Sequence, residues 1–256
     1  MNENERMQML FEVFVPSLPR LGPGDDESTI KALETLYAAG LPGDRPLNIL
    51  ELGCGNGAPT MALAEKTRGA ILALDFHQPF LDELMRRAKA RGFEERIRPY
   101  LKDMNEPDLE QESFDLIWSE GALGGSMGVQ KGLPVCRSLL APGGMMAFTE
   151  LVYFTDEAPR ECREFFGAEY PPMTDVKTNL AYIEEAGFEL LGHFSLDPKA
   201  WLDNFYDPME KRLVEVMEKY AGNPAKMELL APFRQEVDNY REHGKHFGYE
   251  FFMMKK

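Results

Sequence analysis

Short apolar runs alternate with amphipathic stretches along most of this 256-residue chain. Apolar runs of roughly four to eight residues are typical of buried strands, and amphipathic stretches between them are typical of crossover helices. Because parallel strands in one sheet need such crossovers, the alternation predicts an α/β fold with a doubly wound, mostly parallel sheet. The seven expected strands are residues 47–52, 70–75, 96–101, 114–119, 145–152, 188–196 and 247–254.

The N-terminal arm, residues 1–45, lies outside this alternation. Its residues 22–24 read Gly-Pro-Gly, a combination that favours a turn. Asp25 or Asp26 follows and is suited to cap a helix over residues 28–39, because a short carboxylate accepts hydrogen bonds from the free amides of a helix N-terminus. The arm is therefore expected to be helical.

A second region outside the alternation, residues 198–246, precedes the last expected strand. Its apolar residues recur at helical spacing, and Asp207-Pro208 suits an N-cap followed by the first helical position. We expect a helical cap, inserted before the last strand, over one end of the sheet. The core then comprises residues 46–197, and residues 247–256 supply its final strand.

The charge balance excludes several classes of partner. Asp and Glu number 43 against 28 Lys and Arg, so the net charge of -15 offers no basic surface for nucleic acid or an anionic membrane. No apolar run approaches the roughly 18 residues that span a bilayer, and the first residues lack a basic region before an apolar core. We expect a cytoplasmic protein with a small-molecule partner, and its oligomeric state stays open.

The cysteines and histidines do not indicate a metal site. Cys54, Cys136 and Cys162 form no C-x-x-C pair, so neither a disulfide framework nor a thiolate zinc site is predicted. His243 and His246 lie three positions apart, but no third ligand accompanies them. The sequence therefore predicts reduced cysteines and no bound metal.

Residues 48–60 read NILELGCGNGAPT, an apolar run that breaks into glycines and then opens a helix. Gly53 and Gly55 with Ala58 fit the pattern G-x-G-x-x-G/A, in which backbone amides and a helix N-terminus hold a pyrophosphate. Glu51 lies just before the first glycine, and its negative charge would repel a pyrophosphate. A ligand that carries positive charge fits this loop better than a dinucleotide does.

Four segments at the ends of expected strands form a series. They are ELGCGNG after the first strand, Asp75 at the end of the second, Asp103-Met104 after the third and FDLIWSEGA at the fourth. The series resembles the class I, Rossmann-like S-adenosylmethionine-dependent methyltransferases, and within them the small-molecule group. The resemblance implies the Rossmann-like methyltransferase fold, methyl transfer, and S-adenosyl-L-methionine as cofactor with S-adenosyl-L-homocysteine as product. It implies these cofactor-binding residues: Glu51, Gly53, Gly55, Gly57, Asp75, Phe76, Asp103, Met104 and Ser119.

The chemistry of that cofactor suits acidic residues. S-adenosylmethionine has no phosphate and presents a sulfonium, an ammonium group, a carboxylate, a ribose and an adenine. The resemblance assigns Glu51 to the ammonium end, and glycines let the backbone approach the ligand closely. Asp75 can accept hydrogen bonds from both ribose hydroxyls, although NAD-binding folds place an acid similarly. By the resemblance, Asp103 accepts the adenine amino proton and Met104 covers the ring.

The fourth strand leads into Ser119-Glu120-Gly121-Ala122, which differs from the Asp/Asn-Pro-Pro-Tyr signature of methyltransferases that modify amino groups of nucleobases or glutamine. Glu120 is the candidate catalytic residue, as a base for the nucleophile. It could instead contact the cofactor, bind a cationic substrate or form a plain polar strand end. Tyr153 and Trp201 join Glu120 as candidate substrate-binding residues because aromatic faces stabilise a sulfonium, although hydrophobic packing explains both equally well.

Two other functions stay open from the sequence alone. A noncatalytic S-adenosylmethionine-binding protein, such as a sensor or a regulatory subunit, would keep the same loop and acids. An NAD-dependent oxidoreductase is disfavoured by Glu51 and by the absence of a clear Tyr-x-x-x-Lys pair. Fold and cofactor do not determine the acceptor, the choice among O-, N-, C- and S-methylation, or whether the cap closes on substrate.

Overall fold

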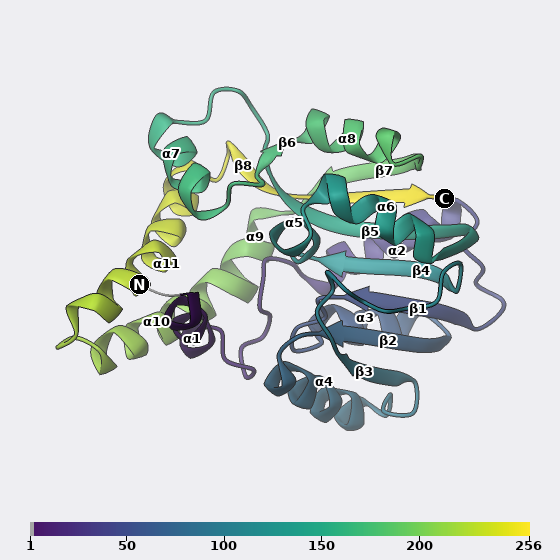
Figure 1. Ribbon diagram of the computed structural model, residues 1–256, viewed down its shortest axis with the longest axis horizontal. Helices are drawn as coiled ribbons and strands as arrows, with labels where there is room; N and C mark the ends of the chain where they lie inside the picture. The colour runs from purple at the N-terminus through teal and green to yellow at the C-terminus, as the bar shows by residue number, and fades with distance from the viewer. Residues whose placement is uncertain (1–2) are drawn as a thin grey trace.

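The computed structural model describes residues 3–256, so the first two residues of the expected arm lie outside the described chain. One eight-stranded sheet runs in the order β3-β2-β1-β4-β5-β8-β7, with β6 paired to β5 (Figure 1). The strands are β1 (Leu47–Leu52), β2 (Gly69–Asp75), β3 (Ile97–Leu101), β4 (Phe114–Glu120), β5 (Leu140–Tyr153), β6 (Thr174–Asp175), β7 (Glu189–Ser195) and β8 (Phe247–Lys255).

The sheet is doubly wound and mostly parallel, as the alternation predicts. β1 pairs in parallel with β2 on one side and with β4 on the other, so the winding reverses between β1 and β4. β8 is antiparallel to both of its neighbours, β5 and β7. All seven expected strands form. The count of seven was one too low, because β6 has only two residues and so short a strand carries no periodicity.

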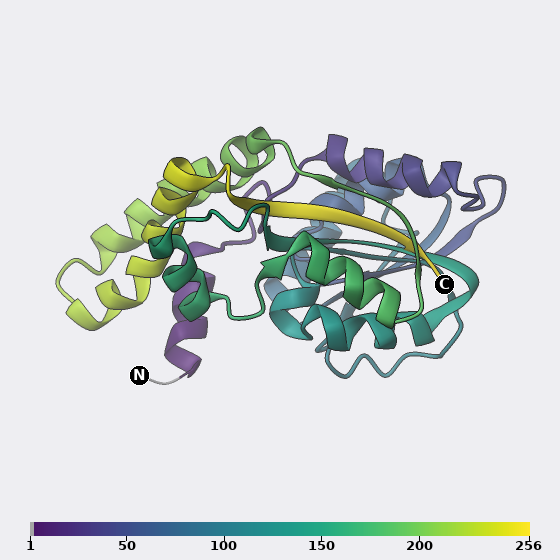
Figure 2. The ribbon, with the colours of Figure 1, turned by 90° about the horizontal axis from the view of Figure 1, so that it is seen from above.

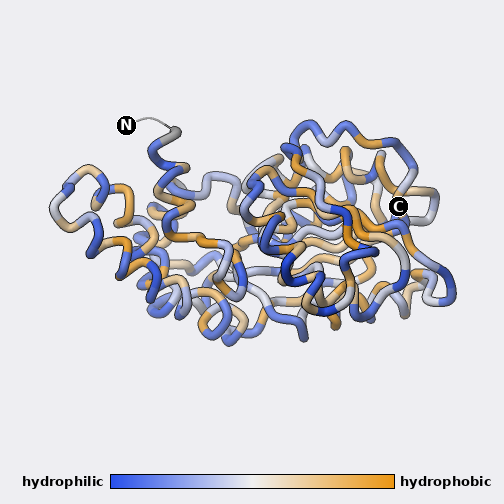
Figure 3. The backbone as a smooth tube through the Cα atoms, turned by 90° about the horizontal axis from the view of Figure 1, so that it is seen from below, coloured by the Kyte–Doolittle hydropathy of each residue, from blue (hydrophilic) through white to orange (hydrophobic). Residues whose placement is uncertain are grey.

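Helices cover both faces of the sheet, as Figure 2 shows from above. α2 (Asp26–Ala38), α3 (Ala58–Lys66) and α4 (Gln78–Arg91) share one apolar core with residues of β1 and β2. α6 (Val129–Leu139) and α8 (Val176–Glu185) enclose a second core on the other face. Apolar residues are concentrated in the strands between these layers, while the outer turns of the helices are largely hydrophilic (Figure 3).

The arm and the cap pack against each other beside the sheet (Figures 1 and 2). α1 (Glu3–Val13) contacts α10 (Asp207–Lys219) and α11 (Pro224–His243) of the cap. After α1 the chain returns to the sheet, where Asp25 caps α2 as expected: its carboxylate accepts a hydrogen bond from the Ser28 amide at 2.7 Å. Two further helices, α5 (Leu123–Ser126) and α7 (Arg160–Glu169), follow β4 and β5.

The cap opens at residue 198 with a continuous run of helix. α9 (Pro198–Trp201), a π-helical turn over Leu202–Tyr206, and α10 follow one another without a break. The N-cap is Asp197, whose carboxylate accepts a hydrogen bond from the Lys199 amide at 2.8 Å. α10 begins at Asp207, but Asp207 is not the expected N-cap, because the residues before it are already helical. The hydrogen-bond register changes from π to α next to Pro208, and a proline without an amide hydrogen is tolerated there.

The described helices do not cross a membrane. Within residues 3–256, no helix is both long enough and apolar enough to do so. α11, with 20 residues the longest of these helices, carries charged side chains along its length.

Candidate functional site

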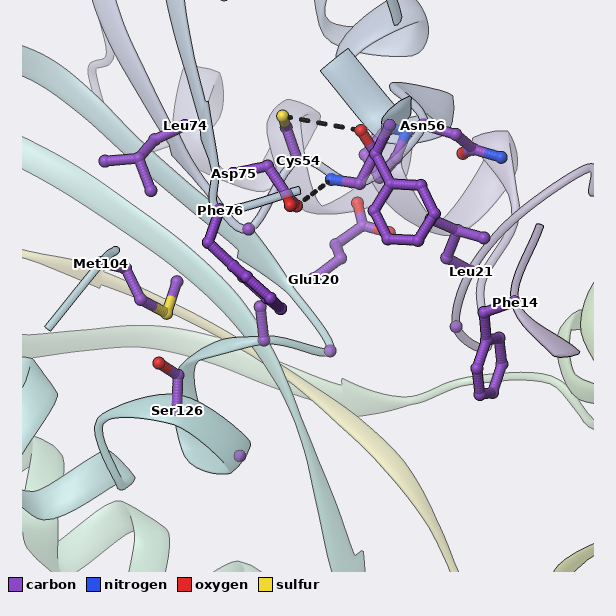
Figure 4. A pocket seen from close by; sticks show the side chains of 18 of the residues that line it. Phe14, Leu21, Cys54, Asn56, Leu74, Asp75, Phe76, Met104, Glu120 and Ser126 are labelled. Carbon is purple, nitrogen blue, oxygen red and sulfur yellow. Dashed lines mark hydrogen bonds between the residues drawn. The ribbon is translucent and has the colours of Figure 1, made fainter. Parts of the chain in front are cut away.

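A cavity of about 770 Å³ opens at the carboxyl ends of β1, β2, β3 and β4. The strand order reverses at this edge, between β1 and β4, which is where doubly wound sheets bind ligands. The loops after these strands form one side of the cavity, and α1 with arm residues 20–23 forms the other. Figure 4 shows Phe14 and Leu21 across the cavity from Met104 and Ser126.

The loop after β1 brings its backbone close to the cavity. Gly53 and Gly55 line the cavity and have φ angles of +69° and +53°, a region that favours glycine. A Cβ on Gly53 would lie 2.3 Å from the Cβ of Ala122, and a Cβ on Gly55 would lie 3.1 Å from Cδ1 of Leu21. Side chains at these two positions would therefore fill the gap between the loop and the segments that face it.

Three of the expected cofactor residues, Glu51, Gly57 and Ser119, do not line the cavity, and two of them have packing roles. Gly57 precedes α3 with a φ of +83°, and a Cβ there would lie 2.3 Å from Cδ1 of Leu84 on α4. Ser119 is fully buried, and its hydroxyl donates to the Leu52 carbonyl at 3.0 Å. These contacts give Gly57 a role in close packing of α3 against α4, and Ser119 a role in joining β4 to β1.

Asp75 ends β2 at the cavity and organises two loops. Its carboxylate accepts hydrogen bonds from the backbone amides of Gly55 and His77, both at 2.9 Å (Figure 4). Burial raises the pKa of Asp75, and the hydrogen bonds from His77 and Gly55 oppose that rise. Because each carboxylate oxygen has two lone pairs, Asp75 keeps acceptor capacity toward the cavity.

Glu51 lies in β1, directly before the glycine loop, without a full set of partners. The residue is 1% exposed, and burial raises the pKa of its carboxyl group to about 8. Its Oε2 atom has no hydrogen-bond partner within residues 3–256, and neither has the hydroxyl of Thr60. Buried polar atoms are nearly always hydrogen-bonded; the Thr60 hydroxyl is one donor near enough to lower the pKa of Glu51, and a ligand could bring another.

Phe76, Asp103 and Met104 line the cavity at the ends of β2 and β3. Phe76 is 57% exposed, whereas Met104 is buried. Asp103 accepts hydrogen bonds from the backbone amide and the side-chain amide of Asn105, both at 2.8 Å, and these bonds lower the pKa of Asp103. An exposed aromatic face, a thioether and a carboxylate thus border the same part of the cavity.

Glu120 ends β4 at the cavity, but its carboxylate is already engaged. Oε2 accepts a hydrogen bond from Arg20 at 2.6 Å, while Oε1 accepts from the Thr29 hydroxyl at 2.7 Å and from the Trp118 indole at 2.8 Å. The Arg20 and Glu120 side chains are only 7% and 5% exposed, so they form a buried ion pair between the arm and the sheet. Nothing in the sequence indicates this partnership, because a contact between residues 100 positions apart leaves no local pattern.

Tyr153 and Trp201 lie outside the cavity lining. Trp201 is 2% exposed and stacks on Tyr240, with 4.6 Å between ring centroids. The ring of Tyr153 lies 5.1 Å from the guanidinium carbon of Arg163. The structure does not bring either residue to the candidate site, and packing explains both.

One face of α1 forms a cavity wall that was not predicted from the sequence. Met7, Leu10, Phe11 and Phe14 all line the cavity. Their spacing of three, one and three residues places them along one side of a helix. This spacing is the sequence pattern from which an apolar helix face could have been predicted.

Neither metal ligation nor disulfide bonding is apparent in the described part of the chain. Residues 3–256 contain no group of three or more His, Cys, Asp or Glu side chains placed to hold a metal. Cys54, Cys136 and Cys162 are buried free thiols.

Residues 49–144 match a family model described as a methyltransferase domain. A curated relative, the 27-O-demethylrifamycin SV methyltransferase of Amycolatopsis mediterranei (strain S699), is 24% identical over 177 residues, which cover 66% of this chain and 65% of the relative. The matches to two curated relatives span 37% and 65% of those proteins' lengths.

Solved structures share the fold over nearly the whole chain. YjhP from E. coli has a TM-score of 0.76 at 18% identity, covering 96% of this chain and 98% of that one. A SAM-dependent methyltransferase from Thiobacillus denitrificans, in complex with S-adenosyl-L-homocysteine, has a TM-score of 0.71 at 19% identity and covers 88% and 90%. The chain therefore has the Rossmann-like fold of these solved structures, and its residues 49–144 match a methyltransferase domain.

Proposed function

We propose that this protein transfers a methyl group from S-adenosylmethionine to a small-molecule acceptor. The observation that carries the proposal is the acidic character of the site: Asp75 and Asp103 line the cavity, and the carboxyl group of Glu51 is buried beside the glycine loop. Arg20 and Lys102 are the cationic side chains among the lining residues, and Arg20 is already paired with Glu120. Such a site suits a ligand with sulfonium and ammonium charges and opposes a pyrophosphate.

The residues at the cavity fit the parts of this cofactor. In the proposed arrangement Asp75 accepts hydrogen bonds from the ribose hydroxyls, and Phe76 and Met104 border the adenine. Asp103 accepts from the adenine amino group, and the unused carboxyl oxygen of Glu51 compensates the ammonium group, directly or through water. The domain match over residues 49–144 and the neighbour of the same fold that is bound to S-adenosyl-L-homocysteine support this assignment.

When bound, S-adenosylmethionine supplies an electrophilic methyl group, whose bond to sulfur breaks as an acceptor lone pair forms the new bond and the sulfur keeps the electron pair. The work left to the chain is to align the acceptor and exclude water. α1 and arm residues 20–23 cover the cavity for that purpose. Gly121 and Ala122, which line the cavity after β4, leave room for the acceptor beside Glu120.

Glu120 is better suited to positioning than to proton transfer. A carboxylate has about four acceptor sites, and three of them receive hydrogen bonds from Arg20, Thr29 and Trp118. We therefore assign Glu120 to holding the arm over the site through Arg20. This replaces the role of general base expected from the sequence.

A small-molecule acceptor and a cytoplasmic location complete the proposal. The curated relative named for demethylrifamycin acts, by its name, on a small molecule, and the acidic chain has no surface charge suited to nucleic acid. The three buried free cysteines suit a reducing compartment.

Calorimetric titration with S-adenosylmethionine, S-adenosylhomocysteine and NAD tests the cofactor. We expect the first two to bind and NAD not to bind. Methyl transfer from labelled S-adenosylmethionine to a panel of small acceptors then separates a catalyst from a noncatalytic binding protein. Tight binding of NAD alone would refute the proposal.

A further inference from the structure

The wall opposite the glycine loop is apolar. It consists of Met7, Leu10, Phe11, Phe14, Leu21 and Pro23, which come from α1 and the arm. Phe14 is only partly buried, and it is held from behind: its ring stacks on Phe205 at 5.9 Å and meets Phe233 edge-on at 5.7 Å. This packing fixes an aromatic face toward the cavity, as Figure 4 shows for Phe14.

The charges at the Glu120 end of the cavity are satisfied within the protein. Arg20 pairs with Glu120 at 2.6 Å and with Asp26 at 3.5 Å. The second oxygen of Glu120 accepts from Thr29 and Trp118. A charged acceptor entering here would lose water without gaining an ionic partner.

The remaining lining residues near Glu120 add little polarity. Gly121, Ala122 and Gly125 have no polar side chain, and the Ser126 hydroxyl accepts a hydrogen bond from Asn105 at 2.9 Å. Lys102 is the other cationic side chain that lines the cavity, and it directly follows β3 and precedes Asp103 in the sequence. The space between α1 and the β4–α5 loop is therefore bordered by apolar surface and by groups that already have partners.

We infer that the methyl acceptor is a neutral, mainly apolar molecule with one small polar nucleophilic group. This inference rests on the methyltransferase function proposed above. The apolar body lies against Phe14 and Leu21, where it removes exposed hydrophobic surface from water. The nucleophilic group then points across the cavity toward the glycine loop, where the cofactor's methyl group would lie. Zwitterionic and phosphorylated acceptors are excluded by the lack of an unpaired charge at this end.

Binding of small probe molecules to the cofactor-saturated protein tests the inference. Naphthol serves as the neutral apolar probe, and ethanolamine phosphate and dimethylglycine serve as charged probes. Each is titrated by calorimetry into the protein with and without excess S-adenosylhomocysteine. We expect naphthol to bind and the two charged probes not to bind.

Variants locate the probe. Phe14→Ala should weaken naphthol binding by about tenfold, the effect expected when part of a phenyl contact is lost, and leave the affinity for S-adenosylhomocysteine unchanged. Leu21→Ala, on the arm, repeats the test should Phe14→Ala fold poorly. Val214→Ala, at a position 44% exposed on α10 and outside the cavity, is the matched control and should bind like the parent.

Stronger binding of ethanolamine phosphate or dimethylglycine than of naphthol would overturn the inference. Absence of naphthol binding at millimolar concentration, or naphthol binding indifferent to both Phe14→Ala and Leu21→Ala, would overturn it too. A failure of S-adenosylhomocysteine to bind would instead count against the proposed function. The probe titrations without S-adenosylhomocysteine would still show whether the wall formed by α1 and the arm binds neutral apolar molecules.

Discussion

Replacing Glu51 by Gln should stabilise the free protein at neutral pH. Glu51 is buried, and its pKa rises from 4.5 to about 8 because its charged form is desolvated. In the unfolded chain the group ionises above its ordinary pKa, whereas in the folded protein it stays protonated up to about 8. The folded state therefore binds more protons in this window, and the free energy of unfolding falls as pH rises through it.

The size of the effect follows from the shift. One pKa unit corresponds to about 1.36 kcal/mol, so the parent should lose roughly 2 to 3 kcal/mol of stability through Glu51 between about pH 5.5 and about pH 7.5. Gln keeps the shape and has no charge to bury, so the variant should lack this loss. Glu150, whose pKa burial raises to about 7, contributes a similar slope to both proteins and cancels in the difference.

Urea unfolding, followed by the fluorescence of the buried Trp118 and Trp201, measures this difference at each pH. Glu34→Gln, at an exposed position of α2, is the control and should follow the parent. Parallel stability curves for parent and Glu51→Gln would refute the reasoning, since Glu51 would then carry no shifted pKa.

The same substitution should impair cofactor binding. If Glu51 gives up its proton to compensate the ammonium group, the parent should release up to about one proton on binding S-adenosylhomocysteine near pH 7. The measured heat then depends on the ionisation enthalpy of the buffer. Glu51→Gln should remove that dependence and weaken binding.

Three further substitutions test the site. Asp75→Ala should weaken S-adenosylhomocysteine binding about ten- to a hundredfold, through the loss of roughly 1.5 to 3 kcal/mol of charge-assisted hydrogen bonding; an unchanged dissociation constant in a folded variant would remove Asp75 from the ribose site. Glu120→Gln should lower the free energy of unfolding by roughly 2 to 4 kcal/mol, since it leaves the buried Arg20 with only the more distant and more exposed Asp26 as anion, and adding Arg20→Met should recover much of the loss. Purely additive losses in urea unfolding would contradict that pairing. Gly57→Ala should cost roughly 1 to 3 kcal/mol of stability because of its positive φ and its contact with Leu84, yet leave the calorimetric affinity for S-adenosylhomocysteine unaltered. A loss of affinity without loss of stability would return Gly57 to the ligand site.

The features that the sequence predicts well are local or follow from the edge of a parallel sheet. The glycine loop and Asp75 come together because the carboxyl ends of β1 and β2 share one edge of the sheet. The backbone amide of Gly55 in that loop donates a hydrogen bond to the Asp75 carboxylate. The cap of α2 at Asp25 depends only on residues three positions apart, and that prediction is confirmed.

The features that escaped prediction depend on tertiary contacts. Nothing near Glu120 in the sequence indicates that Arg20 would neutralise it. The sequence allows Trp201 either a substrate-binding or a packing role, and its stacking on Tyr240 supports packing. Asp207 was expected to cap a helix because Asp207-Pro208 has the composition of a helix start, but a π-helical turn lets the helix run through these residues.

The separation between α1 and the sheet bears on how this protein could change its acceptor in evolution. α1 packs mainly on α10 and α11, so Leu10 on α1 and Phe14 just after it can be exchanged with little disturbance of the strands that carry Asp75 and Glu51. Proteins tolerate new residues as long as overall stability stays above a threshold, and a wall that makes few contacts with the strands offers such positions. Acceptor range can therefore diverge by mutation of the first helix while the cofactor-binding edge of the sheet is inherited unchanged.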